Sequence, residues 1–190
     1  YTLMDITAPA AAVKEMERAI GKLKLNGFLV NSHTNNEHFD NPKYWPILEA
    51  AEALDACIYL HPRGAMDTLK GPMQHYGMHT AMWAYGVETA THAVRMILGG
   101  VFDRFPKLKI CLGHMGEGVH FWLWRIDYMS TSAQEQGRAP RLKLKPSEYF
   151  KRNFLITTSG VEDPVALRYC IEKLRADNIM WAIDYPYQDS

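Results

Sequence analysis

The sequence has no excess of charge of either sign, because 21 lysines and arginines are balanced by 21 aspartates and glutamates. Nucleic-acid-binding proteins typically carry a basic patch and membrane-surface proteins a polybasic segment, so neither partner is expected. The sequence also lacks any apolar run approaching the roughly 18 residues of a membrane-spanning helix. A small molecule remains the expected partner.

Cysteine is scarce as well: Cys57, Cys111 and Cys170 are widely spaced and form no Cys-x-x-Cys pair. An odd number of cysteines in apolar surroundings favours reduced core residues and a cytoplasmic location. The N-terminus has an acidic residue and no positively charged cluster, unlike a signal peptide. It has no initiating methionine, so we expect the 190 residues to be a piece of a longer protein.

Apolar residues are abundant, at 47% of the chain, which is enough for the core of one domain over residues 1–190. Strand-like apolar runs begin near residues 28, 57, 109, 154 and 179, and helical periodicity fills the intervals between them. Repeated strand–helix units predict a parallel sheet, either a barrel or a doubly wound sheet. The stretch 63–86 reads as a long functional loop, often a lid, unless it contains short helices, and residues 131–147 read as a polar loop.

Polar residues follow three of these strands at the point where each strand ends: His61, His114 and Asp184. The carboxyl ends of parallel strands face the active site in α/β folds, so these side chains are expected to converge. Imidazole and carboxylate groups are ligands of Zn²⁺ and Mn²⁺. The alternative is that each is a lone polar residue satisfied by nearby backbone.

The other histidines are weaker candidates for the site. His92 falls within a helical pattern and is read as structural, whereas the rest are read as surface or lid residues: His33, His38, His75, His79 and His120. The segment GHMGEG lacks the pattern of a phosphate-binding loop. The chain contains neither a Gly-x-Ser-x-Gly nor a His-Glu-x-x-His motif.

Three longer runs are more specific: LHPRG (60–64), GVFDRFPKLKICLGHMGE (100–117) and AIDYPY (182–187). Together they resemble the amidohydrolase-related aromatic acid decarboxylases. That group includes the γ-resorcylate, 2,3-dihydroxybenzoate and 5-carboxyvanillate decarboxylases, with aminocarboxymuconate semialdehyde decarboxylase a more distant cousin. NSHT (31–34), FWLWRIDYM (121–129) and DYPYQ (184–188) are most similar to the 5-carboxyvanillate branch.

The resemblance implies a (β/α)₈ TIM-like barrel of the metal-dependent hydrolase (amidohydrolase) type, with one divalent metal ion, Mn²⁺ or Zn²⁺. His61 and Asp184 fall on the metal-ligand positions of the fifth and eighth strands. The family's first-strand ligand motif has no counterpart here. We therefore expect a barrel fragment with strands 3–8, without the N-terminal strands and C-terminal helices.

The resemblance also assigns roles around the substrate. His114 falls on a substrate-contacting histidine, Glu117 on the glutamate that orients it, and Arg125 on an arginine that reaches an anionic group of the substrate. Asp184, or an acid beside the metal, is expected to protonate the ring carbon, and Tyr187 is expected to line the pocket for the ring. For Arg125 the alternative is a helix-surface ion pair with a nearby carboxylate.

The expected activity is therefore metal-dependent, non-oxidative decarboxylation of a hydroxylated aromatic carboxylate. Two alternatives stay open: a hydrolase of the amidohydrolase superfamily acting on a lactone or amide, and an inactive barrel fragment. The resemblance implies a homodimer or homotetramer. The aromatic stretch 121–128 and the segment 63–86 are the expected subunit contacts.

Overall fold

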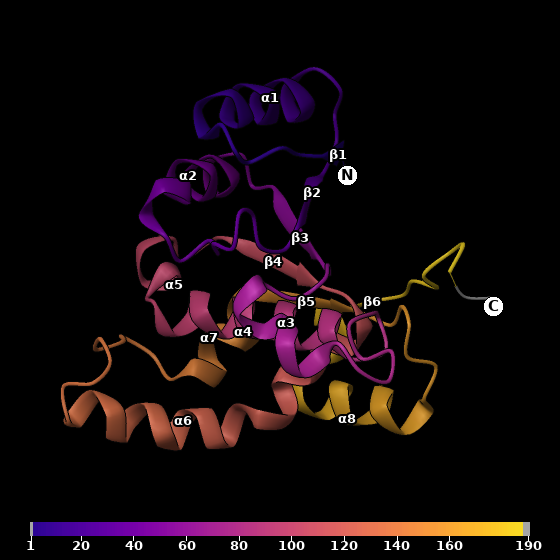
Figure 1. The fold of residues 1–190 in the computed structure, drawn as a ribbon. Coiled ribbons are helices and arrows are strands. Elements are labelled where there is room, and N and C mark those ends of the chain that lie inside the picture. Colours follow the sequence, from indigo (N-terminus) through magenta and orange to yellow (C-terminus); the bar gives the residue numbers. More distant parts are fainter. Residues whose placement is uncertain (1, 188–190) are drawn as a thin grey trace.

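The computed structural model describes residues 2–187, which form one parallel sheet covered by helices. Its strands pair strictly in chain order (Figure 1): β1 (Thr2–Leu3), β2 (Gly27–Asn31), β3 (Cys57–His61), β4 (Lys109–Leu112), β5 (Phe154–Thr157) and β6 (Ile179–Met180). The five predicted strands are confirmed. β1 was missed because two residues carry no periodic signal, and the last strand stops at Met180 instead of Ile183.

Helices connect the strands: α1 (Pro9–Gly21), α2 (Trp45–Ala53), α3 (Asp67–Met73), α4 (Ala84–Leu98), α5 (Val101–Arg104), α6 (Val119–Glu135), α7 (Pro146–Asn153) and α8 (Pro164–Leu174). α8 begins as its sequence predicts, because the Asp163 side chain accepts a hydrogen bond from the Val165 amide at 2.7 Å. Figure 1 shows α1 and α2 side by side along the first strands, and the two helices are in contact.

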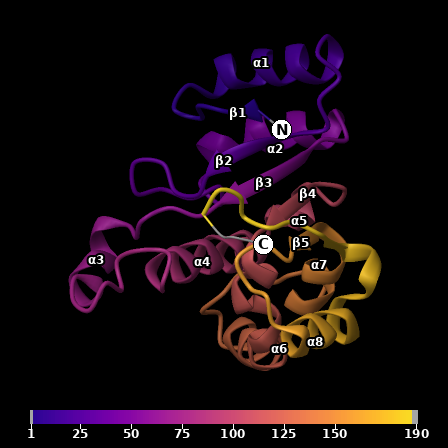
Figure 2. The ribbon, with the colours of Figure 1, turned by 90° about the vertical axis from the view of Figure 1, so that its right-hand side faces the viewer.

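The two segments read as loops are partly helical. α3 lies within residues 63–86, beside the start of α4 (Figure 2), where Met73 and Ala84 share a small apolar cluster. Residues 131–147 contain the end of α6 and the beginning of α7. Both were missed because α3 carries Gly71 and Pro72, and α7 is short and mostly polar.

Burial alternates along β3, so the two faces of this strand have different surroundings. Ile58 and Leu60 of β3, like Ile110 of β4, are fully buried against the helices. Tyr59 and His61 lie on the opposite face and are half-buried. Sequential parallel pairing with an inward row of polar side chains is the arrangement of a partial (β/α)₈ barrel, as predicted.

The fold also agrees with the reading of the cysteines. Cys111 and Cys170 are buried, Cys57 is half-buried, and within residues 2–187 none of the three forms a disulfide. Burial raises the pKa of the Cys111 thiol, which keeps it protonated and inert. Within residues 2–187, no helix combines the length and apolar character needed to cross a bilayer.

Candidate active site

A cavity of about 1540 Å³ opens at the carboxyl ends of the strands. Its lining includes every site residue expected from the sequence: His61, His114, Glu117, Arg125, Asp184 and Tyr187. These side chains come from three different strand ends and from α6, so only the fold brings them together. The expected convergence at the strand ends is therefore observed.

A left-handed turn, η2 (His114–Gly118), sets the geometry of the histidine–glutamate pair. All five residues have positive φ, from 46° at His114 to 72° at Gly116. Glycine adopts this conformation freely, whereas each other residue costs about 1–2 kcal/mol. The turn brings His114 Nδ1 within 2.7 Å of Glu117 Oε1. Backbone strain at a cavity-lining turn is typical of a functional site.

The charge of Glu117 controls the protonation of His114. The Glu117 carboxylate accepts a hydrogen bond from the ring and raises the pKa of His114, while burial of the ring acts against this effect. Asp184 adds a smaller attraction, since its Oδ2 lies 3.9 Å from His114 Nε2. The ring is thus held at Nδ1, and Nε2 is directed toward Asp184.

His61 and Asp184 have the properties of metal ligands. The Nδ1–H of His61 donates to the Pro62 carbonyl oxygen at 2.8 Å, which leaves the lone pair of Nε2 available for a cation. Asp184, with a φ of 59°, follows β6 and contributes a carboxylate to the same cavity. One imidazole and one carboxylate fit Mn²⁺ or Zn²⁺, so this donor set agrees with a divalent ion.

Arg125 projects from α6 into the cavity and makes no ion pair with any residue from 2 to 187. The two nearby carboxylates have other partners in this structure: Glu117 bonds His114, and Asp127 accepts two hydrogen bonds from Ser147. An unpaired guanidinium in a cavity is a natural partner for a substrate carboxylate. Tyr187 is 84% exposed and contributes its ring to the same wall.

Three of the histidines expected at the surface or in a lid lie elsewhere. His33, His38 and His120 are buried, with 4–7% of their surface exposed, and are not surface or lid residues. His75 and His79 are exposed, as expected. The i, i+4 spacing of Glu88 and His92 on one face of α4 is the signal that could have revealed a buried polar cluster.

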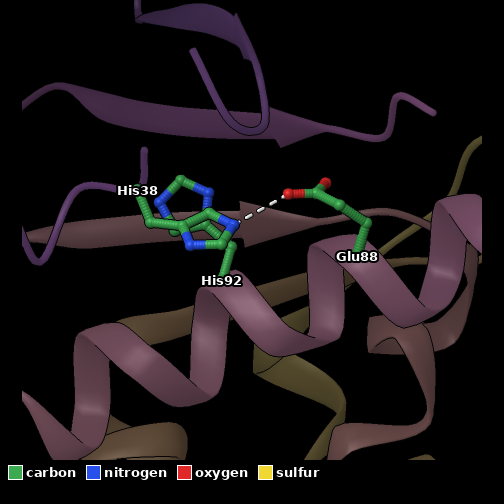
Figure 3. A group of neighbouring side chains, drawn as sticks. All are labelled: His38, Glu88 and His92. Carbon is green, nitrogen blue, oxygen red and sulfur yellow. Dashed lines mark hydrogen bonds and ion pairs between the residues drawn. The ribbon is translucent and has the colours of Figure 1, made fainter. Parts of the chain in front are cut away.

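That cluster comprises His38, Glu88 and His92 (Figure 3), whose ligand atoms all lie within 4.8 Å of one another, a spacing that could hold a metal ion. His38 Nε2 lies 2.9 Å from Glu88 Oε1. Both nitrogens of His92 are already engaged: Nε2 accepts from the Phe39 amide at 2.9 Å, and Nδ1 lies 3.0 Å from Ser32 Oγ. Burial lowers the pKa of His92 well below its usual value, so the ring is neutral. The cluster ties the loop after β2 to α4, and the two hydrogen bonds of the His92 ring are consistent with the structural role expected for it.

Comparison with known proteins agrees with this geometry. The amidohydrolase family model matches residues 2–190. A γ-resorcylate decarboxylase of Polaromonas sp. is 36% identical over the whole chain, which spans 60% of that relative's length. The crystal structure of 5-carboxyvanillate decarboxylase from Sphingomonas paucimobilis is 56% identical, with a TM-score of 0.96, over 98% of this chain and 56% of that one.

A second solved 5-carboxyvanillate decarboxylase, from Novosphingobium aromaticivorans, is 36% identical with a TM-score of 0.92, over 97% of this chain and 54% of that one. It is complexed with manganese and 4-hydroxy-3-methoxy-5-nitrobenzoic acid. The matched family model, the fold and the strand-end site agree with one another. The chain belongs to the amidohydrolase family.

Proposed function

We propose that the protein containing this chain is a metal-dependent carboxy-lyase that removes the carboxylate of a hydroxylated benzoate, with 5-carboxyvanillate as the preferred type of substrate. The observation that carries this proposal is the shared cavity of the His114–Glu117 pair, Asp184 and the unpaired Arg125. The resemblance to 5-carboxyvanillate decarboxylases over nearly the whole chain supports the choice of substrate.

The substrate class follows from the chemistry of the cavity wall. Arg125 provides a guanidinium for an anion that does not react, which suits a ring bearing a second carboxylate. The exposed rings of Trp83, Trp122 and Tyr187 provide apolar walls for a planar aromatic ring. A dicarboxylated phenol meets both features, whereas a simple aliphatic acid would use only the guanidinium.

We assign His61 and Asp184 as ligands of one divalent metal ion. When bound, the ion supplies Lewis acidity and a template for the carboxylate and phenolate oxygens of the substrate. Manganese is preferred over zinc, since manganese is the metal named for the Novosphingobium enzyme.

We assign a separate role in the reaction to each of three residues of this chain. Asp184 is assigned as the group that passes a proton to the ring carbon that bears the carboxylate, which interrupts the aromatic system. The bond from that carbon to the carboxylate then breaks, carbon dioxide leaves, and the electron pair restores aromaticity. His114, held by Glu117, donates a hydrogen bond from Nε2 to the phenolic oxygen where charge develops.

The proposal extends to assembly and location. Phe121, Trp124 and Tyr128 expose between 66% and 76% of their surface along α6, and such aromatic side chains are typical of subunit contacts. We propose that they are covered in a homodimer or homotetramer. Cys57, Cys111 and Cys170 form no disulfide within residues 2–187, and we propose a reducing compartment such as the cytoplasm.

The decisive assay measures carbon dioxide release from 5-carboxyvanillate, γ-resorcylate and 2,3-dihydroxybenzoate, with hydrolysis of an aromatic lactone measured in parallel. Release from 5-carboxyvanillate that is lost together with bound metal in His61→Ala is the expected result. Lactone hydrolysis without carbon dioxide release would replace the proposal with a hydrolase. Failure of the metal-loaded protein in both assays would refute the enzyme assignment.

A further inference from the structure

The ring of His114 rests directly on the backbone of Gly160, in the loop between β5 and α8. A β-carbon at Gly160 would lie 2.3 Å from His114 Cδ2 and 3.1 Å from its Nε2. Real β-carbons essentially never lie within 3.0 Å of another heavy atom, so the contact with Cδ2 could not form, and the ring occupies space that exists only because residue 160 has no side chain. Gly160 also has a φ of +72°, which excludes most other residues.

The other half of the pair meets a second glycine. Gly86, the third residue of α4, would place a β-carbon 3.0 Å from Glu117 Oε2. The Oε1 atom of the same carboxylate bonds His114. Gly86 and Gly160 belong to different strand–helix units, and each contacts a different member of the pair. The pair is therefore enclosed by backbone from two separate parts of the barrel.

We propose that Gly160 and Gly86 are positioning residues, which fix the orientation of the His114–Glu117 pair from two sides. This inference rests on the proposed function for its effect on catalysis, but the contacts themselves do not depend on it. Glu117 restrains the ring only at Nδ1 and would allow it to tilt. Gly160 limits that tilt at the Cδ2–Nε2 edge, so Nε2 keeps its direction toward Asp184 and the cavity.

The main test is Gly160→Ala, with Gly137→Ala as its matched control. Gly137 follows α6 with a φ of +68° and has no atom within 4 Å of its would-be β-carbon. Both variants carry the same backbone penalty, but only Gly160→Ala displaces His114. A displacement of about 1 Å can cost on the order of 100-fold in rate. We expect that loss in kcat for Gly160→Ala, with KM nearly unchanged, and activity close to wild type for Gly137→Ala.

A spectroscopic measurement separates this inference from the proposed function. In the metal-free protein, the Nδ1–H proton of His114 should give a downfield NMR resonance, assigned by its absence in His114→Gln. The resonance should shift or vanish in Gly160→Ala and persist in Gly137→Ala. An unchanged resonance in Gly160→Ala would overturn the inference, whatever reaction the protein catalyses. A shifted resonance in a protein without decarboxylase activity would support the positioning role and refute the proposed function.

Gly86→Ala keeps the inference testable if Gly160→Ala does not fold. Alanine favours a helix over glycine, so this variant should be at least as stable as wild type. Gly71→Ala in α3 is the matched control, since nothing lies within 4 Å of its would-be β-carbon. We expect about a tenfold loss of kcat in Gly86→Ala alone, the lower end of the range for residues supporting a ligand or catalytic group. Wild-type kcat and an unchanged His114 resonance in Gly86→Ala would show that Gly86 has no positioning role.

Discussion

Loss of the negative charge of Glu117 should lower kcat/KM about tenfold. Its carboxylate is 4% exposed and accepts the His114 hydrogen bond at 2.7 Å. Glu117→Gln keeps the shape and an acceptor oxygen but removes the charge, whereas Glu117→Ala removes the bond altogether. The pair of variants therefore separates the contribution of charge from that of orientation.

The expected magnitudes follow from the strength of the bond. A hydrogen bond to a charged group contributes about 1.5–3 kcal/mol and a neutral one about 0.5–1.5 kcal/mol. The charge alone accounts for roughly 1–1.5 kcal/mol, and about 1.4 kcal/mol corresponds to a tenfold change in rate. We expect kcat/KM for carbon dioxide release to fall about tenfold in Glu117→Gln and about 10- to 150-fold in Glu117→Ala.

The assay follows carbon dioxide release from 5-carboxyvanillate at saturating metal, with metal content and circular dichroism recorded for each variant. Glu49→Gln serves as the control, because Glu49 is exposed on α2, on an element that contributes nothing to the cavity lining. Wild-type kcat/KM in Glu117→Ala, with the fold intact, would refute the role assigned to this carboxylate. Equal losses in Gln and Ala variants would attribute the whole effect to charge.

Four further outcomes are expected. His61→Ala should lower bound metal, measured by elemental analysis, to less than about a tenth of wild type, and full occupancy would refute the ligand assignment. Arg125→Gln should raise KM for 5-carboxyvanillate by about tenfold or more and leave KM for γ-resorcylate unchanged, because only the former carries a second carboxylate. Unfolding in urea should show lower stability at pH 5 than at pH 7. Burial lowers the pKa of His33, His92 and His120 below 6.5, so the unfolded chain binds protons that the folded protein rejects; the raised pKa of His114 opposes this trend. Phe154→Ala should cost about 3–5 kcal/mol in free energy of unfolding, since its ring is 2% exposed and stacks on Phe150.

The sequence predicts the elements that bury an apolar face. The strands predicted to begin at Cys57, Lys109 and Phe154 begin at those residues. An unbroken apolar run between two turns is typical of a strand that is buried on both faces of a parallel sheet. The two-residue β1 and the Gly- and Pro-containing α3 were missed because neighbouring elements, not local preference, hold them in place.

The candidate site could be predicted only in part from the positions of residues in the sequence. Strand ends alone brought His61, His114 and Asp184 to one face, whereas the roles of Glu117 and Arg125 came from a resemblance of motifs. The left-handed turn at His114 could not be predicted, since a run of positive φ through Met115 and Glu117 opposes their intrinsic preference. The burial of His38 was missed for a related reason: its partner Glu88 lies fifty residues away in the chain.

The chain-order pairing of the strands has a consequence for synthesis on the ribosome. Each strand of the described sheet pairs with its predecessor, so every newly emerged strand–helix unit finds a finished edge on which to dock. The widest interval between paired residues runs from Ile58 in β3 to Ile110 in β4. At a synthesis rate of about 5–20 residues per second, β4 emerges roughly 3–10 s after β3. His61 therefore emerges well before His114, and Asp184 emerges last of the three. The three candidate site residues can come together only once the segment after β6 has left the ribosome, so a nascent chain should acquire the sheet progressively and this side-chain cluster in a single late step.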